Sequence, residues 1–74
     1  MNKVYIKTLS IDLDKFLKWA GVVSTGGEAK NIIADGLVKV NDVVEKRRSK
    51  KLLPGDVVEI FDEKYIIEHQ GREN

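Results

Sequence analysis

A short segment in the middle of the chain limits the possible folds more than any other feature. Thr25 and Glu28 have capping-box spacing, in which each side chain accepts a hydrogen bond from the other residue's backbone N–H, so a helix is predicted to begin there. Gly36 suits the left-handed conformation that ends a helix. Asn41-Asp42 then separates two short apolar runs, which predicts a tight hairpin. A helix of about three turns followed at once by a hairpin must be stabilised by packing against the rest of the chain.

The N-terminal part of the chain predicts a strand followed by a helix. Residues 3–8 alternate polar and apolar side chains, as a half-buried strand does. Asp12 is placed to cap a helix, and Gly21 is placed to end it. One face of this helix is apolar, and its residues have the spacing of successive helical turns: Leu13, Phe16, Leu17 and Ala20.

The C-terminal third predicts strands joined by turns. Pro54-Gly55 has proline and glycine at the positions that a type II turn requires. Residues 57–61 and 64–68 are predicted as two strands joined by a turn at Asp62-Glu63, and the polar tail 69–74 is expected to fray. The predicted fold class is α+β, with two short helices packed on one face of a small, mostly antiparallel sheet of four to five strands.

Length and composition exclude several classes of protein. At 74 residues, the chain is expected to form a single domain over 1–74. It has no cysteine, so no disulfide or thiolate metal site is available, and a cytoplasmic location is expected. No apolar run approaches the roughly 20 residues of a membrane span. His69 is the only histidine, and no nucleophile, phosphate-loop or paired-carboxylate motif appears. We therefore expect no catalysis, no metal, no cofactor and no membrane partner.

Positive charge is concentrated just after the predicted hairpin. Packing does not explain this cluster, because Lys and Arg are almost never buried without partners. Residues 1–51 hold 11 Lys or Arg against 6 Asp or Glu, a net charge of +5, whereas residues 52–74 hold 2 against 6, a net charge of −4. An exposed cationic segment on a nearly neutral chain predicts a polyanionic partner, and above all a nucleic acid. The cationic residues of this segment are Lys46, Arg47, Arg48, Lys50 and Lys51.

Residues 13–58 resemble the RNA-binding domain first described in ribosomal small-subunit protein four, also called the alpha-L motif. The resemblance covers nearly two-thirds of the chain and depends on the order and spacing of four pieces. These are Leu13-Asp14-Lys15-Phe16-Leu17, Glu28-Ala29-Lys30, the run from Ile33 to Asn41, and Pro54-Gly55-Asp56-Val57-Val58. The short chain, with strands on both sides of the motif, is similar to small stand-alone bacterial proteins of the YaaA type. The resemblance implies non-catalytic RNA binding by the helix pair and the hairpin that follows it.

The main expected contact with RNA is the cationic segment 46–51, which we call the basic loop. Arg can bind a phosphate with two donors at once, and Lys acts as a point charge, so both suit a phosphate backbone. Lys15 and Lys18, on the polar face of the first helix, are expected to extend this surface. The basic-loop contacts are Lys46, Arg47, Arg48, Lys50 and Lys51.

The start of the second helix is a further expected contact. Thr25, Gly26 and Gly27 can leave backbone N–H groups open to a phosphate. The family resemblance adds Lys30 and Asn31 on the exposed face of this helix. Many members of the family carry Ser-Arg in place of Thr25-Gly26 and a basic residue in place of Asn31, so we expect binding to shift toward the basic loop.

The partner predicted from these observations is structured RNA, ribosomal or transfer, bound by a monomer that acts in ribosome assembly or translation. Two other functions stay open. The helix pair could act as a DNA-binding helix-turn-helix, or the acidic C-terminal strands could bind a protein. Trp19, off the apolar stripe of its helix, is expected to seal the edge of the core; the alternative is that it stacks on an unpaired base.

Overall fold

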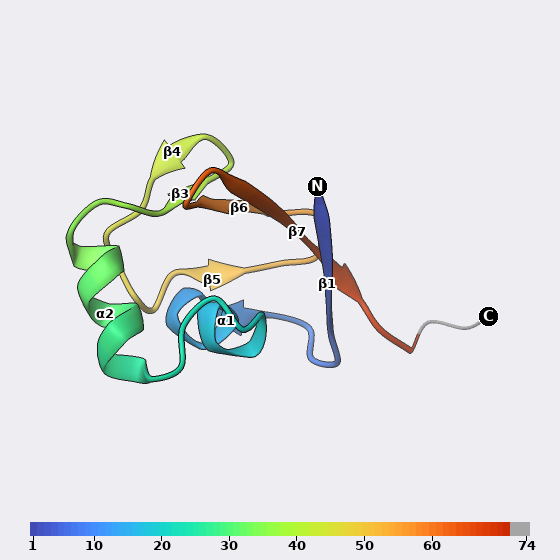
Figure 1. The fold of residues 1–74 in the computed structure, drawn as a ribbon. Coiled ribbons are helices and arrows are strands. Elements are labelled where there is room, and N and C mark those ends of the chain that lie inside the picture. The colour runs from blue at the N-terminus through green and yellow to red at the C-terminus, as the bar shows by residue number, and fades with distance from the viewer. Residues whose placement is uncertain (72–74) are drawn as a thin grey trace.

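The computed structural model describes residues 1–71, and its elements are short (Figure 1). Two helices follow the first two strands, and five further strands complete the chain. In order, the elements are β1 (Asn2–Ile6), β2 (Ile11–Asp12), α1 (Leu13–Trp19), α2 (Gly26–Ala34), β3 (Lys39–Val40), β4 (Val43–Val44), β5 (Lys51–Leu52), β6 (Val57–Ile60) and β7 (Glu63–His69).

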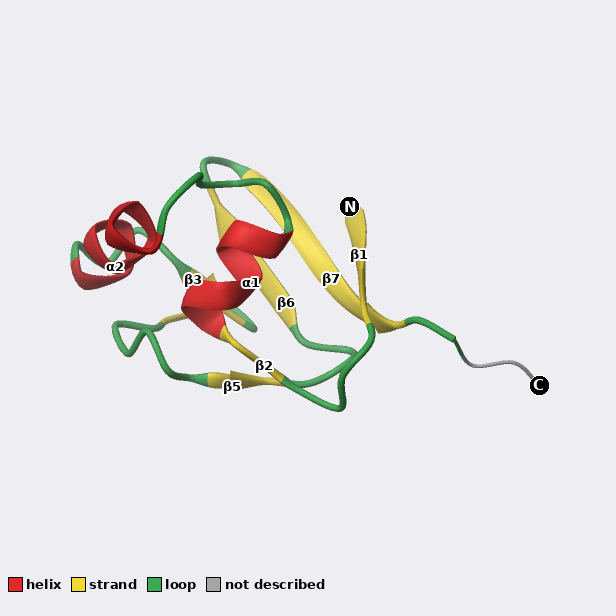
Figure 2. Cartoon of the chain, turned by 90° about the horizontal axis from the view of Figure 1, so that it is seen from below, coloured by secondary structure: helices red, strands yellow, loops and turns green. Residues whose placement is uncertain are grey.

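Five of the strands form one sheet in the order β1-β7-β6-β3-β4. Only β1 and β7 are parallel, and the other three pairs are antiparallel. Both helices lie on one side of this sheet, with α1 in front of it in the view of Figure 2. The predicted fold class is therefore confirmed. The sequence pattern did not indicate the separate pair β2–β5, because strands of two residues are too short to show a period.

A single apolar core lies between the sheet and the helices. Phe16 and Leu17 of α1 are fully buried together with Val58 of β6 and Ile67 of β7. Ile6 of β1 belongs to the same cluster, although it lies far from Val58 and Ile67 in sequence. The remaining buried members are Leu13, Val23, Ala29, Ile33, Val38, Val40, Leu52 and Ile60.

The turns are largely those that the sequence predicts. Asn41 and Asp42 both have positive φ, at 51° and 73°, as a type I′ hairpin turn requires. Gly55 has φ 97°, and the backbone N–H of Asp56 donates to the carbonyl of Leu53 at 3.0 Å, which closes the predicted Pro-Gly turn.

The C-terminal hairpin differs from the prediction by one residue. Phe61 and Asp62 form the turn, with φ of 54° and 63°, and Glu63 already pairs with Ile60. The prediction of Phe61 as a strand residue is therefore wrong. His69, predicted in a fraying tail, instead ends β7 and pairs with Ile6. The last three residues of the predicted tail, 72–74, lie outside the described part of the chain.

The glycine ends of both helices follow the predicted chemistry, and the start of α2 does so with one change of partner. Gly21 has φ 77° after α1, and Gly36 has φ 76° after α2. At the start of α2, the hydroxyl of Thr25 accepts a hydrogen bond from the N–H of Glu28 at 3.1 Å. The Glu28 carboxylate accepts from the N–H of Ser24 at 3.1 Å, and not from that of Thr25 as the capping box predicts.

Candidate nucleic-acid interface

The basic loop is attached to the start of α1 through its backbone. The N–H of Leu13 donates to the carbonyl of Lys50 at 2.9 Å, and the N–H of Asp14 donates to the carbonyl of Arg48 at 3.0 Å. The first N–H groups of a helix have no partner within the helix, so the loop carbonyls satisfy them. The consequence is that the loop backbone is held at a defined place beside α1, and its cationic side chains are carried there.

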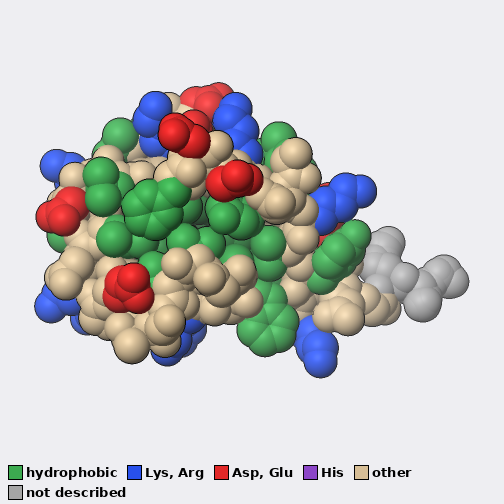
Figure 3. All heavy atoms as spheres, in the orientation of Figure 1, with side chains coloured by type: hydrophobic (Ala, Val, Ile, Leu, Met, Phe, Trp, Pro, Cys, Tyr) green, Lys and Arg blue, Asp and Glu red, His purple; other side chains and the backbone are tan. Residues whose placement is uncertain are grey.

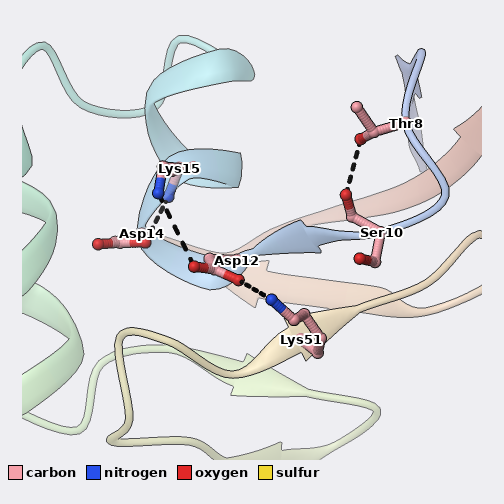
Figure 4. Close-up of polar contacts among 6 residues, drawn as sticks. All are labelled: Thr8, Ser10, Asp12, Asp14, Lys15 and Lys51. Carbon is pink, nitrogen blue, oxygen red and sulfur yellow. Dashed lines mark hydrogen bonds and ion pairs between the residues drawn. The ribbon is translucent and has the colours of Figure 1, made fainter.

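The carboxylate of Asp12 lies between two lysines (Figure 4). It accepts a hydrogen bond from Lys51 Nζ at 3.0 Å, and Lys15 Nζ lies 3.8 Å from its other oxygen. Asp12 occupies the N-cap position of α1, but its side chain makes no capping hydrogen bond, so the prediction that it caps the helix is wrong in this respect. The hydrogen bond from Lys51 is the main cause that holds the pKa of Asp12 below its ordinary value, and the charge of Lys15 adds to it.

A second carboxylate binds another residue of the basic loop. Arg47 donates from Nε to one oxygen of Glu45 at 2.9 Å and from Nη2 to the other at 3.3 Å. The N–H of Arg47 also donates to Glu45, at 3.1 Å. These hydrogen bonds lower the pKa of the Glu45 carboxyl and raise that of the Arg47 guanidinium. Arg47 is therefore engaged by the chain's own carboxylate, although most of its side chain remains exposed.

The five cations of the basic loop thus fall into two sets. Arg47 and Lys51 have carboxylate partners, whereas Lys46, Arg48 and Lys50 form no ion pair within residues 1–71. The sequence did not show this division, because Asp12 is close to Lys51 only in the folded chain.

The basic loop also reaches the end of α2. The Cε atom of Lys46 lies 3.4 Å from the position that a Cβ on Gly36 would occupy. Figure 1 shows the segment between β4 and β5 passing α2 on its way to α1. The basic loop, which joins β4 to β5 in the chain, therefore lies against the end of α2 and the start of α1. The structure brings Lys15 to this region, through its contact with Asp12, while Lys18 is exposed on the next turn of α1.

The start of α2 is a separate exposed region. Thr25, Gly26, Gly27, Lys30 and Asn31 are all exposed. A Cβ added to either glycine would meet no atom within 4 Å, so the backbone is open to an incoming group. Within the described residues, no hydrogen bond or ion pair joins this end of α2 to the basic loop.

The exposed side chains of α2 do not favour a DNA-reading helix. Lys30 is the only cation of the helix, and Glu28 and Asp35 lie on either side of it in sequence, both exposed. Phosphate would repel both carboxylates. A recognition helix needs side chains that reach base edges while cations contact the backbone, and α2 offers little of either.

Trp19 lies outside the core. The residue is 54% exposed, and its indole N–H donates to the carbonyl of Tyr5 at 2.8 Å. The expectation that Trp19 seals the core is therefore wrong. The position of Trp19 away from the apolar stripe of α1 was the feature of the sequence that could have indicated its exposure.

One face of the molecule shows how charge and apolar surface are distributed. In Figure 3, hydrophobic side chains gather at the centre of the face and Lys and Arg side chains lie around its margin, interspersed with acidic ones. Within residues 1–71, no group of three or more His, Cys, Asp or Glu side chains could hold a metal ion. None of the helices described is long and apolar enough to cross a membrane.

The architecture, together with the basic loop that lies against both helices, defines a small α+β domain of the alpha-L type. A family model described as S4 domain matches residues 4–68, and the chain therefore belongs to the S4 domain family. The match includes the strands on both sides of the segment 13–58 that carried the resemblance.

Three relatives illustrate the family. The chain is 48% identical over 59 residues to the probable ribosome maturation protein RlbA of Bacillus subtilis (strain 168), covering 80% of this chain and 83% of RlbA. The solution structure of YbcJ from E. coli, described as having an alpha-L motif involved in RNA binding, matches with a TM-score of 0.70 and 30% identity, over 92% of this chain and 87% of YbcJ. The 30S ribosomal protein S4e from Thermoplasma acidophilum matches with a TM-score of 0.62 and 30% identity; 81% of this chain is covered, but only 32% of S4e.

Proposed function

We propose that this chain is a non-catalytic RNA-binding protein that holds the phosphate backbone of structured RNA with its basic loop and α1. The observation that carries the proposal is the pair of hydrogen bonds from Leu13 and Asp14 to the carbonyls of Lys50 and Arg48. Cations on a free loop would lose much conformational entropy on binding. Here the backbone that carries them is already fixed against a helix.

The cations without an internal partner are proposed as the principal contacts. Lys46 and Arg48 are exposed and Lys50 is half-buried, and none of the three forms an ion pair within residues 1–71; Lys15 and Lys18 extend the same charge along α1. Arg47 and Lys51 are secondary contacts, because RNA must compete with Glu45 and Asp12 for them. The start of α2 is proposed to add backbone contacts, and its residues are Thr25, Gly26, Gly27, Lys30 and Asn31.

Ribosomal RNA is the proposed ligand, with transfer RNA as the alternative. The support is the 48% identity to a probable ribosome maturation protein and the structural match to a ribosomal protein. On this proposal the chain acts as a cytoplasmic bacterial monomer of one domain that associates with ribosomal particles. RNA is preferred to DNA because a DNA-reading helix needs side chains that reach base edges in the major groove, and the exposed face of α2 offers few of them. A protein partner on the acidic C-terminal strands would be compatible with this function.

The test is a triple variant, Lys46→Gln/Arg48→Gln/Lys50→Gln, titrated with a fragment of ribosomal RNA at several salt concentrations. Each lost phosphate contact removes about 0.7 to 0.9 from the slope of log affinity against log salt. We expect the slope to become shallower by about 2 to 3, with a loss of affinity on the order of 100-fold at low salt. Duplex DNA of equal length, titrated at the same salt, measures the preference for RNA.

The matched control removes three charges from the sheet, as Lys3→Gln/Lys39→Gln/Lys64→Gln. These lysines are exposed on β1, β3 and β7, so the control changes net charge equally without touching the basic loop. Circular dichroism establishes that both variants are folded. Equal loss of affinity in the two variants would show a diffuse charge effect and would remove the basic loop as the binding site.

A further inference from the structure

Trp19 is held in a fixed position with much of its ring uncovered. The hydrogen bond from its indole N–H to the carbonyl of Tyr5 ties the side chain to β1. This contact satisfies the one polar group of the side chain, while the residue remains 54% exposed. An aromatic ring that is both oriented and exposed is suited to stacking against another flat ring, because little entropy is lost when the contact forms.

Trp19 lines two hollows, and a third hollow next to them reaches the basic loop. One is lined by Trp19 with Ile11, Lys15 and Lys18, and another by Trp19 with Ile6, Lys7, Thr8 and Ile11. A third hollow shares Thr8, Ile11 and Lys15 with these two and extends to Lys51. Ile11 lines all three hollows, so they lie next to one another around this residue, and their lining extends from Trp19 to Lys51, the first residue of β5; we call them together the Trp19 groove.

The charge along this groove is almost entirely positive. No carboxylate lines either hollow beside Trp19, whereas Lys7, Lys15 and Lys18 do. The one carboxylate of the third hollow, Asp12, is already bound to Lys51. Apolar and aromatic side chains with lysines around them match a nucleotide, whose base has a flat π face that stacks and whose phosphate is an anion.

We propose that this groove binds a single-stranded segment of RNA and that Trp19 stacks on one unpaired base of it. The lysines along the rim contact the phosphates on either side, and the strand continues past Lys15 to Lys51 and the basic loop. This inference rests on the proposed RNA-binding function and adds to it a second kind of contact. The basic loop recognises backbone charge, whereas the Trp19 groove requires an exposed base.

The first experiment follows the fluorescence of Trp19, which is the only tryptophan of the chain. A short oligouridylate is titrated into the protein, and an abasic ribose-phosphate strand of the same length serves as the comparison. Both strands carry the same charge, but only the first can stack. We expect quenching by oligouridylate and little quenching by the abasic strand at equal occupancy, with occupancy measured independently by anisotropy of labelled strands.

The second experiment compares Trp19→Ala with Trp19→Phe. Loss of stacking on one base should weaken oligouridylate binding about 5- to 150-fold in Trp19→Ala and leave the abasic strand bound as before. Trp19→Phe keeps a ring but lacks the N–H that donates to Tyr5, and we expect it to retain most of the affinity. If Trp19→Ala does not fold, the fluorescence measurement on the unaltered protein decides the question.

The outcomes separate this inference from the function on which it rests. Binding of oligouridylate without base-dependent quenching would overturn the Trp19 groove and leave RNA binding by the basic loop intact. Failure to bind any RNA in low salt would overturn both proposals. A change of Trp19 fluorescence with protein concentration alone would show that a second copy of the chain covers the groove, and would also overturn the inference.

Discussion

Asp12 illustrates how one residue of this chain has a different role in the folded molecule from the one its sequence position suggests. Its position before α1 is that of a capping residue. The first N–H groups of the helix, however, donate hydrogen bonds to the carbonyls of Arg48 and Lys50. The carboxylate is left free to bind Lys51 and approach Lys15. It therefore neutralises part of the surface that we propose for RNA, and it competes with phosphate for the same two lysines.

Substitution of this residue tests the competition. Asp12→Asn removes one negative charge and releases Lys51 and Lys15, while asparagine remains acceptable at the N-cap position. We expect RNA affinity to rise roughly 2- to 10-fold at moderate salt, with a slightly steeper salt dependence, because one more phosphate contact becomes available. The measurement is a salt titration of RNA binding by the variant and the unaltered protein.

The matched control for this test is Asp62→Asn at the β6–β7 turn. It removes the same charge from a residue with φ 63°, a conformation that asparagine tolerates well. We expect a much smaller change in affinity from it. Weaker binding by a folded Asp12→Asn variant would contradict competition and would show that Asp12 holds Lys15 and Lys51 in position for phosphate.

At the scale of elements, the basic loop depends on both helices. Its backbone caps α1, and the side chain of Lys46 passes over Gly36 at the end of α2. Gly36 has φ 76°, which a residue with a Cβ adopts only at a cost, whereas an added Cβ would meet Lys46 Cε at 3.4 Å, an ordinary contact distance. This glycine is therefore needed for the left-handed end of the helix, while the basic loop that passes over it leaves room for a methyl group.

The variant Gly36→Ala should lower the free energy of unfolding by about 1–2 kcal/mol, because alanine disfavours the left-handed conformation. Urea denaturation followed by circular dichroism measures the change. Gly27→Ala is the control, since it lies within α2 with open space around its Cβ position. We expect this control to be neutral or to stabilise by up to about 1 kcal/mol. A Gly36→Ala variant as stable as the unaltered protein would show that the left-handed turn is not required.

At the scale of the whole molecule, the two ends of the described chain close the fold together. Strand β1 pairs in parallel with β7, and Ile6 joins Ile67 in the core that the helices cover. The sheet also mixes charges that the sequence separates. Lys39, Glu59 and Lys64 lie opposite one another on β3, β6 and β7, so an acidic residue of the C-terminal third lies between two lysines.

Because β1 pairs with β7 and places Ile6 in the core, we predict that the segment 13–58 does not fold independently. Ile6 is only 2% exposed, so Ile6→Ala should destabilise the protein by about 2–5 kcal/mol, as truncation of a large buried side chain does elsewhere. Tyr5→Ala, the neighbouring exposed position on β1, is the control and should cost far less. Chemical denaturation of both variants measures the difference, and equal losses would show that β1 contributes only its backbone pairing.

Local patterns predicted much of this architecture. The apolar stripe of α1, the Thr25 cap, the glycine that ends each helix and the Pro54-Gly55 turn all depend on interactions within a few residues, and the structure has each of them. The one-residue error at Phe61 arose because residues in a two-residue turn with positive φ are set by the register of β6 and β7, and not by their own preferences.

The sequence by itself determined the two helices, most strands of the five-stranded sheet and the place where positive charge is concentrated, since these are properties of neighbouring residues. Only the tertiary structure decided which cations have partners and which surface they share. Asp12 and Lys51 are far apart in the chain but 3.0 Å apart in space, and Trp19 meets Tyr5 and Ile11 only after β1, β2 and α1 have packed. Contacts between distant segments depend on how the whole core closes, and no local pattern contains that information.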